Sequence, residues 1–167
     1  MNCMEPNHKL ETLVKTVTYL LLKAPQELIN VDVEIYEQLF AMTEKFKENE
    51  EIFESIIWMQ STLLEVNSSE EQHAKAINIC SQLNCHKTFL EGIQRNCERI
   101  VLQSLSGLVV LAKIPKFRRE LVGEFGNGLF VELAKLITKR IATFTLVPNE
   151  IETTLVHFLA EITSKTS

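Results

Sequence analysis

Cysteine and histidine are the side chains here best suited to bind a metal or to act as nucleophile and base, and the chain has four of each. The segment CSQLNCH brings Cys80, Cys85 and His86 close together in the sequence, and Cys97 follows further on. A structural zinc site needs a second matching pair of ligands, which the sequence lacks. Because Cys80 lies on the apolar face of a predicted helix, we interpret these cysteines as buried core thiols. We expect no metal and no cofactor.

Catalysis by an acid, a base or a nucleophile has no local motif to support it. Asp32 is the only aspartate, and the chain has no Gly-x-Ser-x-Gly elbow. The histidines lie far apart, at His8, His73, His86 and His157. We therefore predict a protein that is not an enzyme and has no catalytic residue. The competing hypothesis of an enzyme with a dispersed site requires a deep polar pocket with a perturbed cysteine or histidine.

The segment GEFGNGLF holds three of the five glycines, and such a cluster raises the question of a phosphate-binding loop. Gly123, Gly126 and Gly128 read Gly-x-x-Gly-x-Gly, the reverse of the dinucleotide-binding spacing. They follow a predicted helix rather than a strand, and no Gly-Lys-Ser/Thr comes after them. We predict instead that Gly126 or Gly128 adopts a left-handed conformation at a helix end and lets two helices meet closely.

The elements that position these residues are predicted to be helices. Apolar residues recur every three to four positions along the chain, and no clean strand alternation interrupts them. Prolines and a serine cap, Ser68 or Ser69 in NSSEEQ, divide the pattern. We predict helices from about Pro6 to Pro25, at 31–47 and 50–65, from the NSSEEQ cap to about 83, and at 86–95, 97–113, 116–124, 128–142 and 149–164.

Two of these helices carry specific packing predictions. The helix at 97–113 is apolar nearly all round, so it should be the central and most buried one. The helix at 31–47 should turn five apolar side chains inward, namely Ile35, Tyr36, Leu39, Phe40 and Phe46. The fold class is therefore all-α, with about eight or nine helices of uneven length.

Length and composition favour one domain that spans residues 1–167. No run of 18 apolar residues is present, so we expect no membrane-spanning helix. The first residues, MNCMEPNHKLE, lack the order of charges and apolar residues that marks a secretory signal. We expect an intracellular protein of the cytoplasm or nucleus, with reduced thiols.

Charge is unevenly distributed along the chain. Residues 1–86 carry a net charge of −8, residues 87–140 carry +5 and residues 141–167 carry −2. A mildly basic segment inside an acidic chain argues against broad nucleic-acid binding, which usually requires a strongly basic domain. It is compatible with a local patch that binds an acidic partner.

The uneven helix lengths favour stacked helical repeats over a four-helix bundle. The segments LLLKAPQELI (20–29) and VLAKIPKFRRELV (110–122) share an apolar helix end, a lysine two residues before a proline, and an apolar restart. The segment CSQLNCHKTFLEGI (80–93) has a similar rhythm, in which Leu83 ends a helix and Phe89 restarts the apolar face.

Residues 102–137 resemble an armadillo repeat. Leu105, Leu108 and Ala112 match the first helix of that pattern, and Arg118 or Arg119 matches its arginine. The glycine of the pattern corresponds to Gly126 or Gly128, and the final helix to Leu129, Leu133, Leu136 and Ile137. HEAT repeats and unrelated helical hairpins share parts of this pattern.

The resemblance implies a right-handed α-solenoid, or α–α superhelix, of about three to four armadillo-like units. Its general function would be protein–protein interaction: an adaptor or scaffold that binds a peptide or helix of a partner within a larger complex. Import receptors of the armadillo family bind basic peptides through regularly spaced pairs of Trp and Asn. Trp58 is the only tryptophan, so that mechanism is not expected here.

The predicted partner-binding residues are the cations of the C-terminal half: Lys113, Lys116, Arg118, Arg119, Lys135 and Lys139. As one positive surface they would bind an acidic protein segment. Reversing the charge of both Arg118 and Arg119 should then abolish binding and lower the melting temperature little. Ordinary solvated charges are the competing interpretation. A nucleic-acid-associated helical protein that uses the same patch over residues 113–140 is the alternative function.

Overall fold

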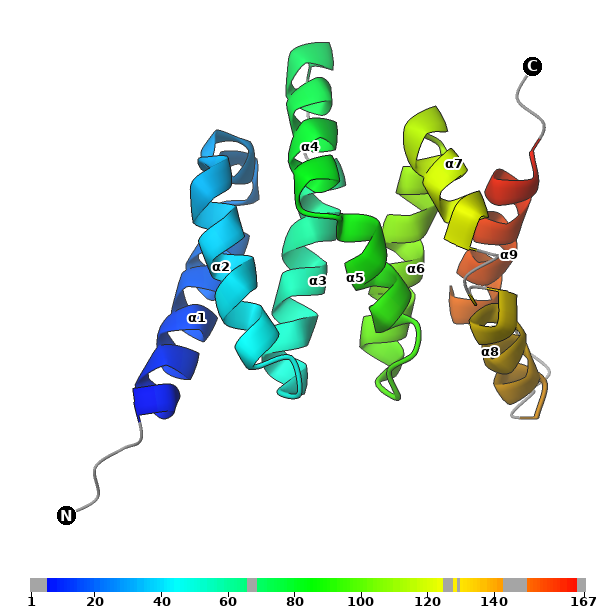
Figure 1. The fold of residues 1–167 in the computed structure, drawn as a ribbon, viewed down its shortest axis with the longest axis horizontal. Helices are drawn as coiled ribbons and strands as arrows, with labels where there is room; N and C mark the ends of the chain where they lie inside the picture. The colour runs from blue at the N-terminus through cyan, green and yellow to red at the C-terminus, as the bar shows by residue number, and fades with distance from the viewer. Residues whose placement is uncertain (1–5, 66–68, 125–127, 129, 143–149, 165–167) are drawn as a thin grey trace. The chain divides into compact units, whose positions relative to one another are not determined.

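The computed structural model describes residues 6–65, 69–124, 128, 130–142 and 150–164 (Figure 1). Every regular element in these ranges is a helix, which confirms the all-α class. The chain divides into two compact units, Met1–Asn84 and Cys85–Ser167, and each is described by itself. The single domain predicted for residues 1–167 stays a prediction.

The described α-helices occur where the sequence pattern predicts them, whereas the 3-10 helix after Pro25 was not predicted. The first unit contains α1 (Pro6–Lys23), the 3-10 helix η1 (Pro25–Asn30), α2 (Val33–Lys45), α3 (Glu50–Glu65) and α4 (Glu70–Gln82). The second unit contains α5 (Cys85–Gly92), α6 (Glu98–Ala112), α7 (Pro115–Glu124), α8 (Phe130–Ala142) and α9 (Glu150–Thr163). The predicted serine cap is confirmed at Ser69, whose side chain accepts a hydrogen bond from the Gln72 amide at 3.2 Å. Ser68 lies outside the described residues.

The first unit is built around α3, which contacts α1, α2, α4 and η1. Most of its side chains are buried, and they leave one narrow row toward solvent that includes Trp58. In α2, Tyr36 and Leu39 are buried as predicted. Ile35 is 48% exposed, so its predicted inward orientation is wrong. Because Ile35 and Tyr36 are adjacent in a helix, they point about 100° apart, and only one of them faces α3.

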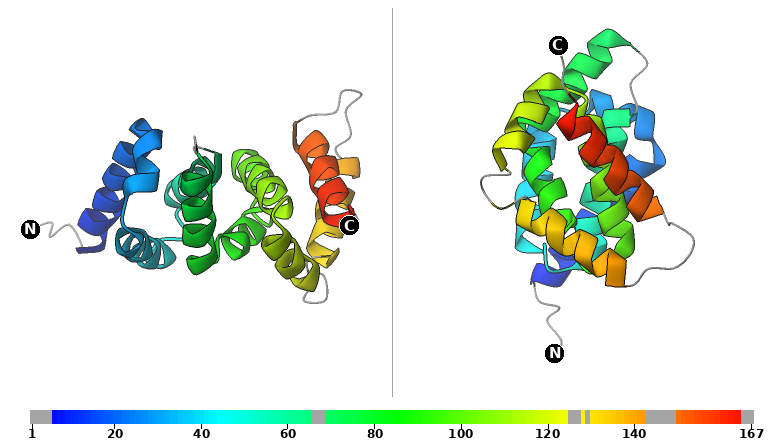
Figure 2. Two further views of the ribbon diagram at one scale, coloured as in Figure 1. Left: turned by 90° about the horizontal axis from the view of Figure 1, so that it is seen from above. Right: turned by 90° about the vertical axis from the view of Figure 1, so that its right-hand side faces the viewer.

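The second unit is built around α6, which packs against α5, α7 and α9 (Figure 2). Its leucines at 105, 108 and 111 are fully buried, so the predicted central position of this helix is confirmed within its unit. No single described helix is long and apolar enough to cross a membrane. Only α6 and α7 taken together have the required length and composition, and they are bent by 118°.

Each unit contains a proline junction, at which a long helix ends and proline starts a new helical segment; that segment is a 3-10 helix in the first unit and an α-helix in the second. In the first, α1 ends at Lys23 and η1 begins at Pro25; in the second, α6 ends at Ala112 and α7 begins at Pro115. Proline cannot supply the amide that a continuing helix needs, but it fits the first position of a new one. The Tyr36 hydroxyl donates a 2.6 Å hydrogen bond to the Leu28 carbonyl in η1, which ties α2 to the junction of the first unit.

A close helix contact at a glycine occurs at Gly107, which lies outside the predicted glycine cluster. Gly107 on α6 faces the buried ring of Phe89 on α5, and a Cβ at residue 107 would lie 2.5 Å from that ring. Gly128 does have a positive φ of 106°, but a Cβ there would meet nothing within 4 Å. Gly126 lies outside the described residues. A left-handed helix end occurs at Asn84, with φ 50°, directly after α4 and Leu83.

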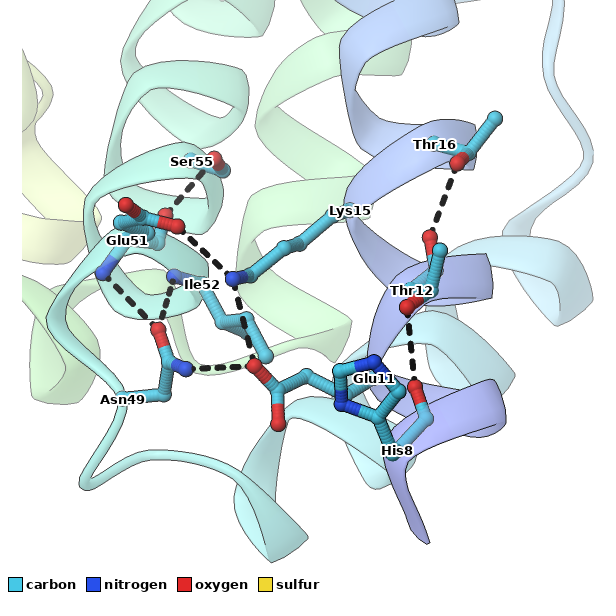
Figure 3. Close-up of polar contacts among 9 residues, drawn as sticks. All are labelled: His8, Glu11, Thr12, Lys15, Thr16, Asn49, Glu51, Ile52 and Ser55. Carbon is cyan, nitrogen blue, oxygen red and sulfur yellow. Dashed lines mark hydrogen bonds and ion pairs between the residues drawn. The ribbon is translucent and has the colours of Figure 1, made fainter. Parts of the chain in front are cut away.

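A polar network joins α1 to the start of α3 (Figure 3). The Asn49 side-chain oxygen accepts hydrogen bonds from the amides of Glu51 and Ile52, at 3.1 and 3.3 Å, and so caps α3. The Asn49 amide donates to Glu11 on α1 at 2.7 Å. Lys15 on α1 bonds Glu51 at 2.7 Å and Glu11 at 3.2 Å. Asn49 therefore fixes both the start of α3 and its position beside α1.

The Lys15–Glu51 pair has a defined pH window. The hydrogen bond from Lys15 lowers the pKa of Glu51 below its usual 4.5, and hydrogen bonds to Glu51 and then Glu11 raise the pKa of Lys15 above 10.5. The Glu51 contribution to stability is thus lost as pH falls through its lowered pKa. The Lys15 contribution is lost as pH rises through its raised pKa. Both groups are solvent-exposed, so the contribution is small.

Replacing Gly107 by alanine should destabilise the second unit. The new methyl group would overlap the Phe89 ring, which is buried and cannot swing into solvent. Overpacking of this kind costs about 1–3 kcal/mol. Gly123→Ala is the matched control: a Cβ there meets nothing within 4 Å, and alanine in a helix gains up to about 1 kcal/mol over glycine. Chemical denaturation of both variants measures the difference, and a Gly107→Ala protein as stable as Gly123→Ala would contradict the contact.

Lys15→Met should raise the pKa of Glu51 toward its ordinary value, because the hydrogen bond that lowers it is gone. An NMR titration of the Glu51 side-chain carboxyl measures this directly. Lys9→Met, on the same helix, is the control and should leave the Glu51 pKa unchanged. A Glu51 pKa that does not respond to loss of Lys15 would show that the pair does not form in solution.

Candidate protein-binding site

The six predicted partner-binding cations fall into groups with different environments. Lys113, Lys116 and Arg119 are exposed at the turn between α6 and α7. Lys135 and Lys139 are exposed on α8, one helical turn apart. They line a cavity, and none of the three turn residues is among the residues that line it. Lys113, Lys116 and Arg119 therefore lie outside this cavity, and the single surface of all six cations stays a prediction.

Arg118 is a structural residue rather than a surface cation. It is only 9% exposed, and its Nε donates a 2.7 Å hydrogen bond to the carbonyl of Ala112, the last residue of α6. A cation at this position also suits the negative end of the helix dipole. The sharp turn at Pro115 lets the first turn of α7 reach back to α6. Little of the Arg118 side chain is therefore left for a partner, whereas its neighbour Arg119 is exposed, and partner binding by either residue stays a prediction.

The cavity has a volume of about 400 Å³ and lies within the second unit. Its walls come from the α5–α6 connection, the start of α6, α8 and the first turn of α9. The apolar part is formed by side chains that are at most 9% exposed: Ile93, Val101, Leu136 and Ile151. The polar part consists of Gln94, Arg95, Asn96, Glu98, Glu132, Lys135 and Lys139. The site thus combines an apolar wall with three cations and two carboxylates.

Local contacts hold the cavity cations in place. Arg95 bonds Glu91 at 3.0 Å, one turn back on α5, and Lys135 bonds Glu132 at 2.9 Å on α8. Lys139 lies 3.5 Å from the side-chain oxygen of Asn96, which joins α8 to the α5–α6 connection. Arg95 and Lys139 therefore approach the same cavity from segments more than 40 residues apart in the sequence.

The sequence pattern identifies the α8 lysines but not their partners in the cavity. Arg95 and Asn96 belong to a short polar connection, GIQRNCE, between two helices. Its sequence indicates a break between those helices but not a binding site. Ile151 lies on α9, far from Arg95 and Asn96 in the sequence, and only the folded chain brings it to the cavity. Helical periodicity predicts which face of a helix is buried, but not which helices meet.

The cysteine and histidine cluster is part of the packing. Cys80 and Cys85 are buried, as predicted, and Cys97 is half-buried. The His86 ring lies beside Phe117, with centroids 6.2 Å apart, and its Nδ1 lies 3.6 Å from a Glu120 carboxylate oxygen on α7. Within the described ranges, no three His, Cys, Asp or Glu side chains are placed to hold a metal ion.

No family model, curated protein or solved structure matches this chain.

Arg118→Glu and Arg119→Glu should separate structural from surface roles. Arg118→Glu removes the bond to Ala112 and places a carboxylate near a carbonyl oxygen, at a cost of about 2–3 kcal/mol. For a chain of this size that corresponds to a fall of roughly 4–12 °C in melting temperature. Arg119→Glu should change stability by less than about 0.5 kcal/mol. Thermal unfolding followed by circular dichroism measures both, and equal melting temperatures would contradict the buried role of Arg118.

Proposed function

We propose that this chain is a non-catalytic protein-binding module and that the cavity of the second unit receives an acidic segment of its partner. The observation that carries the proposal is the cavity itself, in which Arg95, Lys135 and Lys139 border an apolar wall. A partner segment with an apolar side chain next to a carboxylate would complement both the apolar wall and the cations of the cavity. The apolar side chain displaces water from the wall, and the carboxylate bonds a lysine or the arginine.

The size and composition of the cavity favour a peptide side chain over a whole cofactor. At about 400 Å³ it is at the small end of ligand sites, which span roughly 300–1,000 Å³. Its carboxylates, Glu98 and Glu132, would repel a highly charged phosphate ligand. The net excess of one positive charge among its lining residues suits a single carboxylate better.

We also propose that the helices form an armadillo-like α-solenoid of about three to four units. Support comes from the proline junction that recurs in both units. In each, a long helix ends, proline begins a shorter helical segment, and apolar residues two to four positions after the proline are buried: Leu28 and Ile29 in one unit, Phe117 in the other. Similar sequence segments at corresponding helix ends are what a repeat protein requires.

Charge reversal of the cavity lysines tests the proposed function. The double variant Lys135→Glu and Lys139→Glu should lose the protein partner that co-purifies with the unchanged chain from its native cell. Both side chains are exposed, so the fold should be retained. Lys113→Glu with Lys116→Glu is the matched control and should keep the partner, because those lysines do not line the cavity.

Mass spectrometry of nuclease-treated eluates measures the outcome. A partner that both variants retain would contradict the cavity as the binding site. Recovery of nucleic acid alone, in eluates that are not treated with nuclease, and its loss with the Lys113→Glu and Lys116→Glu variant would instead support the nucleic-acid alternative.

A further inference from the structure

The solvent face of α1 is apolar where a surface helix usually carries charge. Leu13, Tyr19 and Leu20 are 54%, 58% and 61% exposed. Thr12 and Thr16 complete the face, and their hydroxyls donate to backbone carbonyls within the same helix, at 2.9 and 2.8 Å (Figure 3). Because those hydroxyls already have acceptors, the face offers mainly apolar atoms over more than two helical turns. We call these five residues the α1 face.

The solvent face of α9 is also largely free of lysine, arginine, aspartate and glutamate. Val156 is 63% exposed, and His157, Ala160 and Thr163 are exposed beside it. The Thr163 hydroxyl donates to the Leu159 carbonyl at 2.7 Å. The opposite side of α9 is anchored on α6 through residues such as Phe158. We call Val156, His157, Ala160 and Thr163 the α9 face.

The charges around the two faces have opposite sign. Lys9 and Lys23 are exposed at the two ends of the α1 face, and Lys23 lies over the Tyr19 ring at 4.9 Å. Helix α9 contains three glutamates and no lysine or arginine: Glu150 and Glu152 near its start and Glu161 near its end. By helical rise, the lysines are about 21 Å apart and Glu150 and Glu161 about 16 Å apart. Long side chains can bridge that difference.

We propose that the α1 face of one molecule binds the α9 face of a second copy of this chain. Leu13, Tyr19 and Leu20 pack against Val156 and its neighbours, and the lysines at either end meet the glutamates of α9. The same pairing disfavours the symmetric alternatives, because α1 on α1 would bring lysines together and α9 on α9 would bring glutamates together.

Such an interface is heterologous, so each molecule keeps one unused face and can bind a further copy. A single helix pair buries less than the roughly 1,200 Å² typical of stable complexes. The association is therefore weak and increases with protein concentration.

Two complementary variants test the proposal by sedimentation velocity over a wide concentration range. The α1 variant carries Leu13→Glu and Leu20→Glu, and the α9 variant carries Val156→Glu and Ala160→Glu. All four side chains are exposed, so folding should survive, and circular dichroism verifies it. Each variant alone should self-associate at least about tenfold more weakly than the unchanged chain.

Mixing is the decisive step, because the α1 variant keeps an intact α9 face and the α9 variant an intact α1 face. The mixture should form a one-to-one heterodimer and nothing larger. Ile35→Glu, on an exposed apolar residue outside both faces, is the control and should associate like the unchanged chain.

Three results would overturn the proposal. An unchanged chain that stays monomeric at every concentration excludes self-association. An α9 variant that still dimerises alone would show that α1 binds α1. A mixture that remains monomeric, while the unchanged chain associates, would place the contact elsewhere. Raising the salt concentration should weaken the complex without abolishing it, because the lysine–glutamate contacts are screened and the apolar contact is not.

Discussion

The proline that follows a long apolar helix is the constraint on which the second unit depends. Pro115 ends α6 because it has no amide to continue the helical hydrogen bonds, and it starts α7 because its fixed φ is already helical. The resulting 118° bend brings Arg118 back to the end of α6. There it bonds the Ala112 carbonyl, which α6 itself leaves without an intrahelical donor. One backbone restriction thus determines why two adjacent arginines have different roles.

The first unit has the same constraint with different chemistry. Pro25 ends α1 and begins η1, and a tyrosine hydroxyl rather than a guanidinium fastens the junction, at Leu28. Asn49 adds a second set of hydrogen bonds in this unit, because it caps α3 and also bonds Glu11 on α1. In both units, buried apolar residues provide the driving force for packing. A few directed hydrogen bonds at helix ends decide which helix ends meet.

Helical periodicity and proline positions predicted the described α-helices and their approximate ends, because both effects are local, but they did not predict the 3-10 helix η1. Contacts between helices could be predicted less well from the sequence. The close helix contact at Gly107 was not predicted, because its critical neighbour is Phe89 on another helix. Similarly, Arg118 and Arg119 are indistinguishable in sequence. The cavity emerges only when α8 and the α5–α6 connection come together.

Carbodiimide cross-linking of the unchanged chain to its partner, followed by peptide mass spectrometry, tests the central claim most directly. The reagent joins a lysine to a carboxylate in direct contact without adding a spacer. The proposed function predicts links from Lys135 or Lys139 to an aspartate or glutamate of the partner. Links confined to Lys113 and Lys116 would contradict it, because those lysines lie outside the cavity.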